Sequence, residues 1–283
     1  MALSERSYQA MACRMIELSA EPSPVDLMPQ VVSLARKAGA LIMSIYDTGT
    51  VEVQIKTDAS PLTQADLASH CVIVEGLSRL TPGWPVLSEE STSIPFEQRS
   101  GWQRYWLVDP LDGTKEFVNR TGEFTVNIAL IENGFPILGV VYAPVIERMY
   151  FAATGSGAFK EMDGKTSRIN VCDYQLGTVK IVASRSHRGE KLDAFLARIG
   201  EHEAVSMGSS LKFCLVAEGS ADLYPRLGPT MEWDTAAAQC VVEVAGGAVE
   251  DINGVRLHYN KPDLLNPEFV VSGNPPFPWR RYI

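Results

Sequence analysis

The stretch "WLVDPLDGTKEF", Trp106–Phe117, ends an apolar run with two aspartates that lie three residues apart. A proline follows Asp109, and Gly113 and Thr114 follow Asp112. One interpretation is a simple turn, because proline pre-sets φ for a turn position and Asp and Gly are common turn residues. The other interpretation is a metal site at the carboxyl end of a strand. This motif alone leaves both open.

The same stretch contains the donor atoms of a magnesium site. The carboxylates of Asp109 and Asp112 and the carbonyl of Leu111 are hard oxygen ligands, which Mg²⁺ prefers. Gly113 and Thr114 stand at a predicted helix start, where free backbone N–H groups bind phosphate. Together they favour metal-assisted phosphoryl chemistry. Enzymatic hydrolysis of phosphate monoesters is accelerated up to about 10²¹-fold, and one positioned acid or base supplies only about 10²–10⁴.

Composition restricts the class of protein. The chain has 283 residues, 46% hydrophobic and 21% charged, which predicts a globular protein of two compact units or one large α/β unit. No apolar run approaches the roughly 20 residues that span a bilayer. Residues 1–25 read as a polar extension and not as a secretory signal. The net charge of −9 disfavours nucleic-acid binding. We therefore expect a cytoplasmic location.

Cysteine and histidine usage fits this expectation. The five cysteines are scattered and form no C-x-x-C pair, which predicts free thiols in a reducing compartment. The four histidines lack H-E-x-x-H spacing, so the sequence gives little support to a zinc site.

The first part of the chain predicts an α+β arrangement. Apolar spacing predicts helices over 26–48 and 63–80, and "VEVQIK" between them alternates like a strand. Asn133-Gly134 predicts a hairpin turn. A helix pair backed by an antiparallel meander follows from this pattern, with strands at "WPVLS" (84–88), "RYWLV" (104–108), "FTVNIALI" (124–131), "PILGVVYA" (136–143) and "ERMYFAA" (147–153).

After about residue 170 the pattern changes to alternating strands and helices. We therefore expect an α+β domain over 26–170 and an α/β domain over 171–283. The expected elements of the second are strands at "TVKIVAS" (178–184), "HEAVSM" (202–207), "ADLYP" (221–225) and "FVVSG" (269–273), and helices near 190–199, from Ser210, and over 234–245.

Further carboxylates lie where predicted elements begin or end, and each has a structural explanation. Asp66 fits a helix-opening T-x-x-D box, Asp234 fits a helix cap, and Glu89-Glu90 fits a solvated pair. Asp58 lies in "KTDASPLTQAD". Each structural explanation is plausible for one residue alone, but it is less convincing when so many carboxylates occupy such positions in one chain.

Four motifs in order, "KTDASPLTQAD", "LSEES", "DPLDGTKEF" and "WDTAAAQCVVEVAGG", resemble the signature set of the inositol monophosphatase superfamily. "SRSH", "GSSLKFCLVAEG" and "LYPRLGPTMEWDTAA" are most similar to its bacterial 3′(2′),5′-bisphosphate nucleotidase branch. The resemblance runs from about Asp26 to the C-terminus. It implies a layered αβαβα sandwich of two subdomains with the active site between them. It also implies a lithium-sensitive phosphatase that uses two or three Mg²⁺ ions.

The resemblance also implies roles for individual residues. Asp66 and Thr114 match the pair that prepares the nucleophilic water, together with Glu89. Asp58 matches a residue near a weaker third metal, and Lys56 offsets that negative charge. The implied metal ligands are Glu89, Asp109, the Leu111 carbonyl, Asp112 and Asp234. The implied substrate contacts are Glu89, Leu111, Asp112, Gly113, Thr114, His187, Ser209, Lys212, Arg226 and Asp234. For the residues thought to bind the nucleotide, surface solvation is the alternative, because lone Lys and Arg are usually exposed.

The implied reaction is hydrolysis of the 3′-phosphate of adenosine 3′,5′-bisphosphate by in-line attack of a metal-activated water, which gives 5′-AMP and phosphate. 3′-Phosphoadenylyl sulfate is a second candidate substrate, and the implied role is in sulfur assimilation or nucleotide recycling. An inositol monophosphatase or sugar bisphosphatase is the enzymatic alternative. A catalytically silent nucleotide-binding protein is the other, although no core carboxylate is missing. Peripheral membrane association and the oligomeric state stay open.

Overall fold

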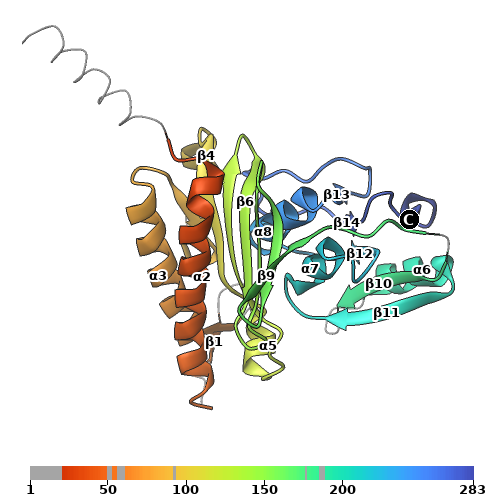
Figure 1. Cartoon of the computed structure of the whole chain (residues 1–283), viewed down its shortest axis with the longest axis horizontal. Coiled ribbons are helices and arrows are strands. Elements are labelled where there is room, and N and C mark those ends of the chain that lie inside the picture. The colour runs from red at the N-terminus through yellow and green to blue at the C-terminus, as the bar shows by residue number, and fades with distance from the viewer. Residues whose placement is uncertain (1–20, 50–52, 56–60, 92–93, 176, 185–188) are drawn as a thin grey trace, which may run out of the picture.

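The computed structural model describes residues 21–49, 53–55, 61–91, 94–175, 177–184 and 189–283. Over these residues the elements stack in five layers, helix–sheet–helix–sheet–helix (Figure 1). Helices α2 (Pro24–Tyr46) and α3 (Gln64–Leu80) form one outer layer. Helices α7 (Leu211–Ala217) and α8 (Glu232–Val244) lie between the sheets, and α6 (Glu190–Ile199) forms the other outer layer. The predicted αβαβα sandwich is confirmed.

The first sheet, as far as it is described, has seven strands in sequence order. All neighbours pair antiparallel except β3 and β4, which are parallel. The predicted antiparallel meander is confirmed from β4 to β7, and β8 and β9 extend it beyond the prediction. The prediction was wrong for β3, which pairs parallel to β4; a parallel pair needs a crossover connection, and residues 89–103 separate these two strands. The strands are β3 (Val86–Ser88), β4 (Arg104–Asp112), β5 (Thr125–Glu132), β6 (Phe135–Ala143), β7 (Arg148–Ala153), β8 (Gly157–Met162) and β9 (Lys165–Ile169).

The predicted hairpin turn joins β5 to β6. Asn133 and Gly134 both have positive φ, 50° and 80°. A two-residue hairpin loop of this kind matches the twist of the flanking strands, and Asn-Gly is its preferred sequence. The turn prediction is confirmed.

The second sheet has the described strand order β11-β10-β12-β14-β13. Its first three strands are parallel, as the alternating pattern predicts, and the last two run antiparallel. Strand β13 was not predicted. The strands are β10 (Val179–Ser184), β11 (His202–Met207), β12 (Leu223–Arg226), β13 (Ala248–Asp251) and β14 (Phe269–Ser272). The chain passes between the sheets after Ile169, and the division into domains at residue 170 stays a prediction.

Several short elements complete the described chain, and one short helix bears on the site. Helix α5 (Thr114–Val118) begins at the predicted helix start, directly after Gly113. The others are β1 (Val53–Ile55), β2 (Pro61–Thr63), η1 (Glu89–Ser91), α4 (Phe96–Arg99) and η2 (Trp279–Arg281).

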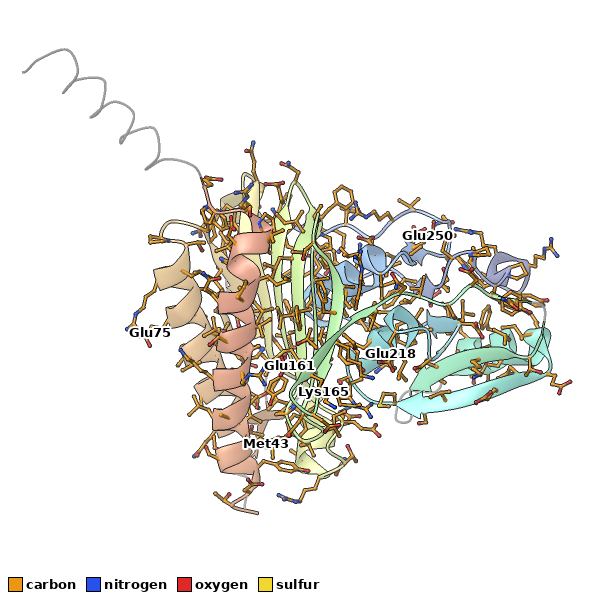
Figure 2. All side chains as sticks on the ribbon, viewed as in Figure 1. Met43, Glu75, Glu161, Lys165, Glu218 and Glu250 are labelled. Carbon is orange, nitrogen blue, oxygen red and sulfur yellow. The ribbon has the colours of Figure 1, made fainter. Side chains whose placement is uncertain are left out.

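The interior between the sheets is filled by side chains (Figure 2). Glu218, at the end of α7, accepts hydrogen bonds from Lys160 Nζ at 2.6 Å and Tyr150 Oη at 2.9 Å. Its side chain is only 9% exposed. Because β7 and β8 supply these partners, the pair ties the middle helical layer to the first sheet.

Two further sequence expectations concern the described residues. Cys71, Cys172, Cys214 and Cys240 are free thiols, as predicted. None of the described helices has the length and apolarity needed to cross a bilayer.

Helix α8 lies very close to the first sheet because β6 presents Gly139 at the contact. A Cβ at this position would overlap the carbonyl oxygen of Ala237 and lie 2.8 Å from the Cβ of Cys240. The facing residues of α8 are small and buried, Ala236 and Ala237 among them. This close approach brings the start of α8 to the end of β4.

We expect Gly139→Ala to destabilise the protein by about 1–3 kcal/mol, because overpacking forces rigid backbone apart. Thermal unfolding measures the effect. Gly101→Ala is the matched control, since a Cβ at Gly101 meets nothing within 4 Å. An equal, small change in both variants would contradict the close contact.

Candidate active site

The alternation of β4 determines which side chains face the helix α8. Trp106 and Val108 belong to the apolar cluster under α2 and α3, whereas Tyr105 and Leu107 belong to the cluster under α8. Side chains of a strand alternate between the two faces of its sheet. Asp109 follows in the second series, so its side chain lies on the face that α8 covers.

A register shift brings the second aspartate of the motif to the same region. Strict alternation would put Asp112 on the face opposite Asp109, but the pairing of β4 with β5 shifts between these two residues. Leu111 is buried in the cluster under α2 and α3. Such an irregularity re-aims side chains at a strand end. Residues 109–112 belong to β4, so an irregular strand end, and not the turn of the first interpretation, carries both aspartates to the same region.

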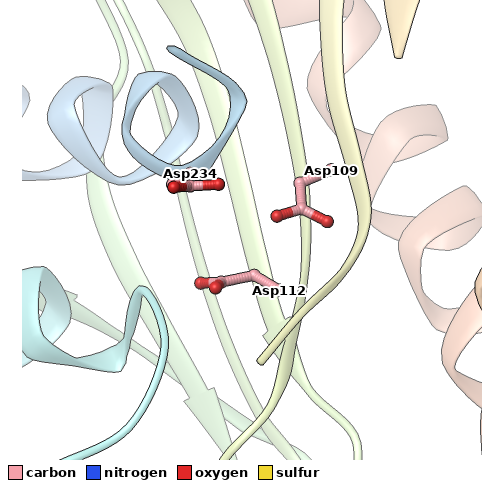
Figure 3. Close-up of side chains that lie close together, drawn as sticks. All are labelled: Asp109, Asp112 and Asp234. Carbon is pink, nitrogen blue, oxygen red and sulfur yellow. The ribbon is translucent and has the colours of Figure 1, made fainter. Parts of the chain in front are cut away.

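Asp109, Asp112 and Asp234 converge where β4 ends and α8 begins (Figure 3). One carboxylate oxygen from each lies within 4.8 Å of the others, the single group of this kind found among the described residues. Asp109 is only 1% exposed. Carboxylates alone, without His or Cys, form the hard-oxygen donor set that suits Mg²⁺.

Electrostatics in this cluster favour a bound cation. Burial, and then the charges of Glu89, Asp112 and Asp234, raise the pKa of Asp109 well above its usual value. Burial, followed by Asp112 and Glu89, likewise raises the pKa of Asp234. Buried like charges disfavour one another. A cation among the three carboxylates would remove this repulsion, so the residues present fit a divalent metal.

Asp112 is held by the start of α7. Its Oδ2 accepts hydrogen bonds from the backbone N–H of Ser210 at 2.6 Å and the Ser210 hydroxyl at 2.8 Å. The hydroxyl oxygen of Ser210, Oγ, also lies 2.7 Å from the backbone oxygen of Asp234 and accepts a hydrogen bond from Asn127 Nδ2 at 2.8 Å. Burial raises the pKa of Asp112, while Lys212 and Ser210 act to lower it. Neither Ser210 nor Asn127 was predicted as a site residue, although Ser210 precedes a predicted helix and lies in the quoted motif "GSSLKFCLVAEG".

Asp66 contacts both the helix α3 and the motif after β4. Its Oδ2 accepts from the backbone N–H of Thr63 at 2.8 Å and from the Thr63 hydroxyl at 2.6 Å, which completes the helix-opening box. Its Oδ1 accepts from the Thr114 hydroxyl at 3.3 Å. Thr114 Oγ1 also lies 3.4 Å from the Leu111 carbonyl. The structural and functional interpretations of Asp66 therefore both fit.

The Glu89-Glu90 pair is half-buried in η1, directly after β3. The charge of Glu89 raises the pKa of Asp109 and Asp234, so Glu89 stands near the cluster. The charge of Glu90 instead affects the pKa of His70: burial lowers this pKa, and Glu90 partly offsets the effect by raising it. His70 Nδ1 lies 2.9 Å from the Ser88 hydroxyl. Glu89 lies outside the group of three aspartates.

A pocket of about 250 Å³ opens beside the carboxylates. Lys212 lines this pocket and is only 7% exposed, so it is not the solvated surface lysine of the alternative interpretation. Its Nζ donates to the Ser209 carbonyl at 2.6 Å, and burial lowers its pKa to about 8 although Asp112 acts to raise it. Of the predicted site residues, Asp112, Gly113, Thr114, Ser209, Lys212, Arg226 and Asp234 line the pocket.

Several polar atoms of the pocket lack a partner within the described structure. They are Ser209 Oγ, Arg226 Nε and Thr230 Oγ1, each buried. Buried polar groups without partners are rare in folded proteins. Their convergence on one pocket indicates a polar ligand. Thr230 was not predicted as a site residue, although it lies in the quoted motif "LYPRLGPTMEWDTAA".

Three predicted site residues, Lys56, Asp58 and His187, lie outside the described residues. Their roles stay predictions.

The chain is similar in sequence and in fold to known proteins. A sequence profile described as the inositol monophosphatase family matches residues 25–277. The 3′(2′),5′-bisphosphate nucleotidases CysQ of Salmonella typhimurium and Escherichia coli are 55% and 56% identical over 248 residues, which cover 87% of this chain and 99% of each relative. The crystal structure of CysQ from Bacteroides thetaiotaomicron, described as a bacterial member of the same family, superposes with a TM-score of 0.78 at 44% identity. It covers 86% of this chain and 96% of its own. The resemblance stated from the motifs is confirmed.

We predict that Mg²⁺ raises the melting temperature, and raises it more at about pH 8 than at about pH 5.5. A ligand at about 100 times its Kd adds about 2.7 kcal/mol, or roughly 5–10 °C. The cluster carboxylates have folded pKa values above the unfolded value. The metal-free fold therefore binds extra protons at low pH and loses stability as pH rises through the folded pKa values. Protons and Mg²⁺ compete for the same oxygens. An equal Mg²⁺ effect at both pH values would contradict this.

Proposed function

The chain belongs to the inositol monophosphatase family, and we infer that it is a 3′(2′),5′-bisphosphate nucleotidase, a phosphoric monoester hydrolase. The observation that carries this inference is 55% identity to a protein of that activity over 99% of the relative's length. The substrate we propose is adenosine 3′,5′-bisphosphate, converted to 5′-AMP and phosphate. 3′-Phosphoadenylyl sulfate is the second candidate substrate.

We propose that the cofactor is Mg²⁺, held by Glu89, Asp109, the Leu111 carbonyl, Asp112 and Asp234. The carboxylate cluster supports this proposal, because its donors are all hard oxygens. Bound cations would polarise the phosphoryl oxygens, favour ionisation of water and stabilise the departing oxygen. Two or three ions per site follow from the family resemblance alone.

Asp66 and Thr114 are proposed to remove the proton of the attacking water. The Thr114 hydroxyl donates to Asp66 Oδ1 at 3.3 Å, which leaves the threonine oxygen able to accept from a water. Asp66 is 2% exposed and its other oxygen is occupied by Thr63, so the carboxylate cannot rotate away. The water oxygen bonds to phosphorus as the bond from phosphorus to the 3′ oxygen breaks, and the departing 3′ oxygen takes a proton from solvent to become the 3′-hydroxyl of 5′-AMP. The water proton passes through Thr114 to Asp66.

The pocket beside the carboxylates is proposed to hold the nucleotide. Lys212 and Arg226 place positive charge in it, as does Lys115, and these cations would attract the phosphates of the nucleotide to a protein of net charge −9. Gly113, Thr114 and Ser209 line the same space. We also propose His187 as a nucleotide contact, on the basis of the sequence alone. The proposed cytoplasmic location likewise rests on the sequence alone.

Phosphate release from adenosine 3′,5′-bisphosphate, inositol 1-phosphate and fructose 1,6-bisphosphate, with and without Mg²⁺, tests the function. We expect rapid, magnesium-dependent release from the nucleotide and much slower release from the other two. Preference for the inositol or sugar phosphate would support the assignment as a phosphatase but overturn the assignment of a nucleotide substrate. No release from any of them would favour the silent binding protein.

Thr114→Ala tests the proton path. We expect kcat to fall by about 10²–10⁴, the usual contribution of a positioned acid or base, with KM changed little. Asp163→Asn is the matched control, because Asp163 is exposed in the turn between β8 and β9. A Thr114→Ala enzyme with kcat close to that of the parent would remove Thr114 from the path.

A further inference from the structure

A segment of irregular chain, residues 258–266, crosses the first turn of α8; we call it the α8 strap. It pairs with the residues just before Asp234 through backbone hydrogen bonds. Glu232 N donates to Leu264 O at 2.9 Å, and Asn266 N donates to Thr230 O at 2.8 Å. Met231 and Leu265 form an antiparallel bridge between these bonds. The strap therefore holds the backbone that carries Asp234.

Glu232 is the buried attachment point of the strap. Its side chain is fully buried and accepts three hydrogen bonds, all from the strap. They come from Asn260 N at 2.8 Å, Lys261 N at 3.0 Å and Lys261 Nζ at 2.6 Å. A buried carboxylate needs a paired cation and satisfied lone pairs. Lys261 supplies that cation, and it neutralises Glu232, which lies only two residues before Asp234 of the acidic cluster.

Asn266 secures the other end of the strap. Its Nδ2 donates to Met231 O at 2.8 Å and lies 3.0 Å from Thr235 Oγ1, so its contacts bracket Asp234 along the chain. Its Oδ1 accepts from Lys261 Nζ at 3.2 Å. Lys261 thus bonds to both attachment points at once.

The strap is itself anchored to the first sheet's side of the molecule. Arg99, at the end of α4 and 2% exposed, donates to Asn260 Oδ1 and to Pro262 O, each at 2.9 Å. Asn260 Nδ2 donates back to Arg99 O at 2.7 Å. The support behind Asp234 is therefore continuous from α4 through the strap to α8. Its charged and amide side chains do not line the pocket beside the carboxylates; they are Arg99, Glu232, Asn260, Lys261 and Asn266.

We propose that Lys261 is a positioning residue: through Glu232 and Asn266 it sets the start of α8 and holds Asp234 at the distance from Asp109 and Asp112 that cation binding requires. This deepens the proposed function, on which it rests. Partners that orient a metal ligand without touching the metal typically change metal affinity by 10–100-fold when they are removed. Replacement of Lys261, in contrast, would leave substrate binding unaffected when the cation is saturating.

Calorimetric titration of the full chain with Mg²⁺ alone tests this proposal in the variant Lys261→Met. We expect the Mg²⁺ dissociation constant to rise about 10-fold or more. The Mg²⁺ concentration for half-maximal activity rises in parallel, and KM for the nucleotide at saturating Mg²⁺ changes less than about twofold. Lys261→Arg keeps a cation and is expected to restore most of the affinity. Because titration needs no turnover, it separates this proposal from failure of the nucleotidase assignment.

Lys191→Met is the matched control, since Lys191 pairs with Glu268 at the same 2.6 Å but on an exposed surface away from the cluster. It is expected to leave Mg²⁺ affinity unchanged. Should Lys261→Met not fold, Asn266→Ser carries the same expectation, because it leaves the ion pair intact and removes the bonds to Met231 and Thr235. A folded variant of either kind with parental Mg²⁺ affinity, or an equal loss in Lys191→Met, would overturn the proposal.

Discussion

Repulsion among three clustered carboxylates, one buried and two half-buried, is the physical constraint on which the site depends. Asp109 and Asp112 come from the end of β4 and Asp234 from the start of α8, and burial raises the pKa of all three. A fold gains nothing in stability from such a cluster, because like charges in a low-dielectric interior oppose one another. The cluster therefore costs stability through charge repulsion, and its oxygen donors fit a cation that would offset that cost.

The surroundings of the cluster divide into groups that restrain it and groups that offer opposite charge. Ser210 fixes Asp112 with two short hydrogen bonds, and Gly139 allows α8 to approach the sheet closely enough to deliver Asp234. Lys212 brings positive charge from the pocket side. The cluster can therefore face a polar pocket on one side and rigid packing on the other.

Two residues serve local structure and the site at once. Asp66 completes the helix-opening box of α3 with one oxygen and contacts Thr114 with the other. Asp234 accepts from the Met231 N–H in the first turn of α8 while its carboxylate joins the cluster. For such residues a structural explanation is no evidence against a functional one, because each carboxylate has two oxygens.

Local signals in the sequence determined most of the elements and marked the hard-oxygen donors of Asp109, Leu111 and Asp112, since alternation, helix capping and turn chemistry act within a few residues. Glu89 and Asp234 entered the proposed ligand set through the motif resemblance. Reasoning from local signals missed β8, β9 and β13, whose patterns are weak. Only the tertiary structure decided which groups meet. Ser210 reaches Asp112, Thr230 faces the pocket, and Lys261 pairs with Glu232, all through contacts between segments far apart in the chain. Packing of α8 between two sheets creates those contacts, and no local pattern encodes them.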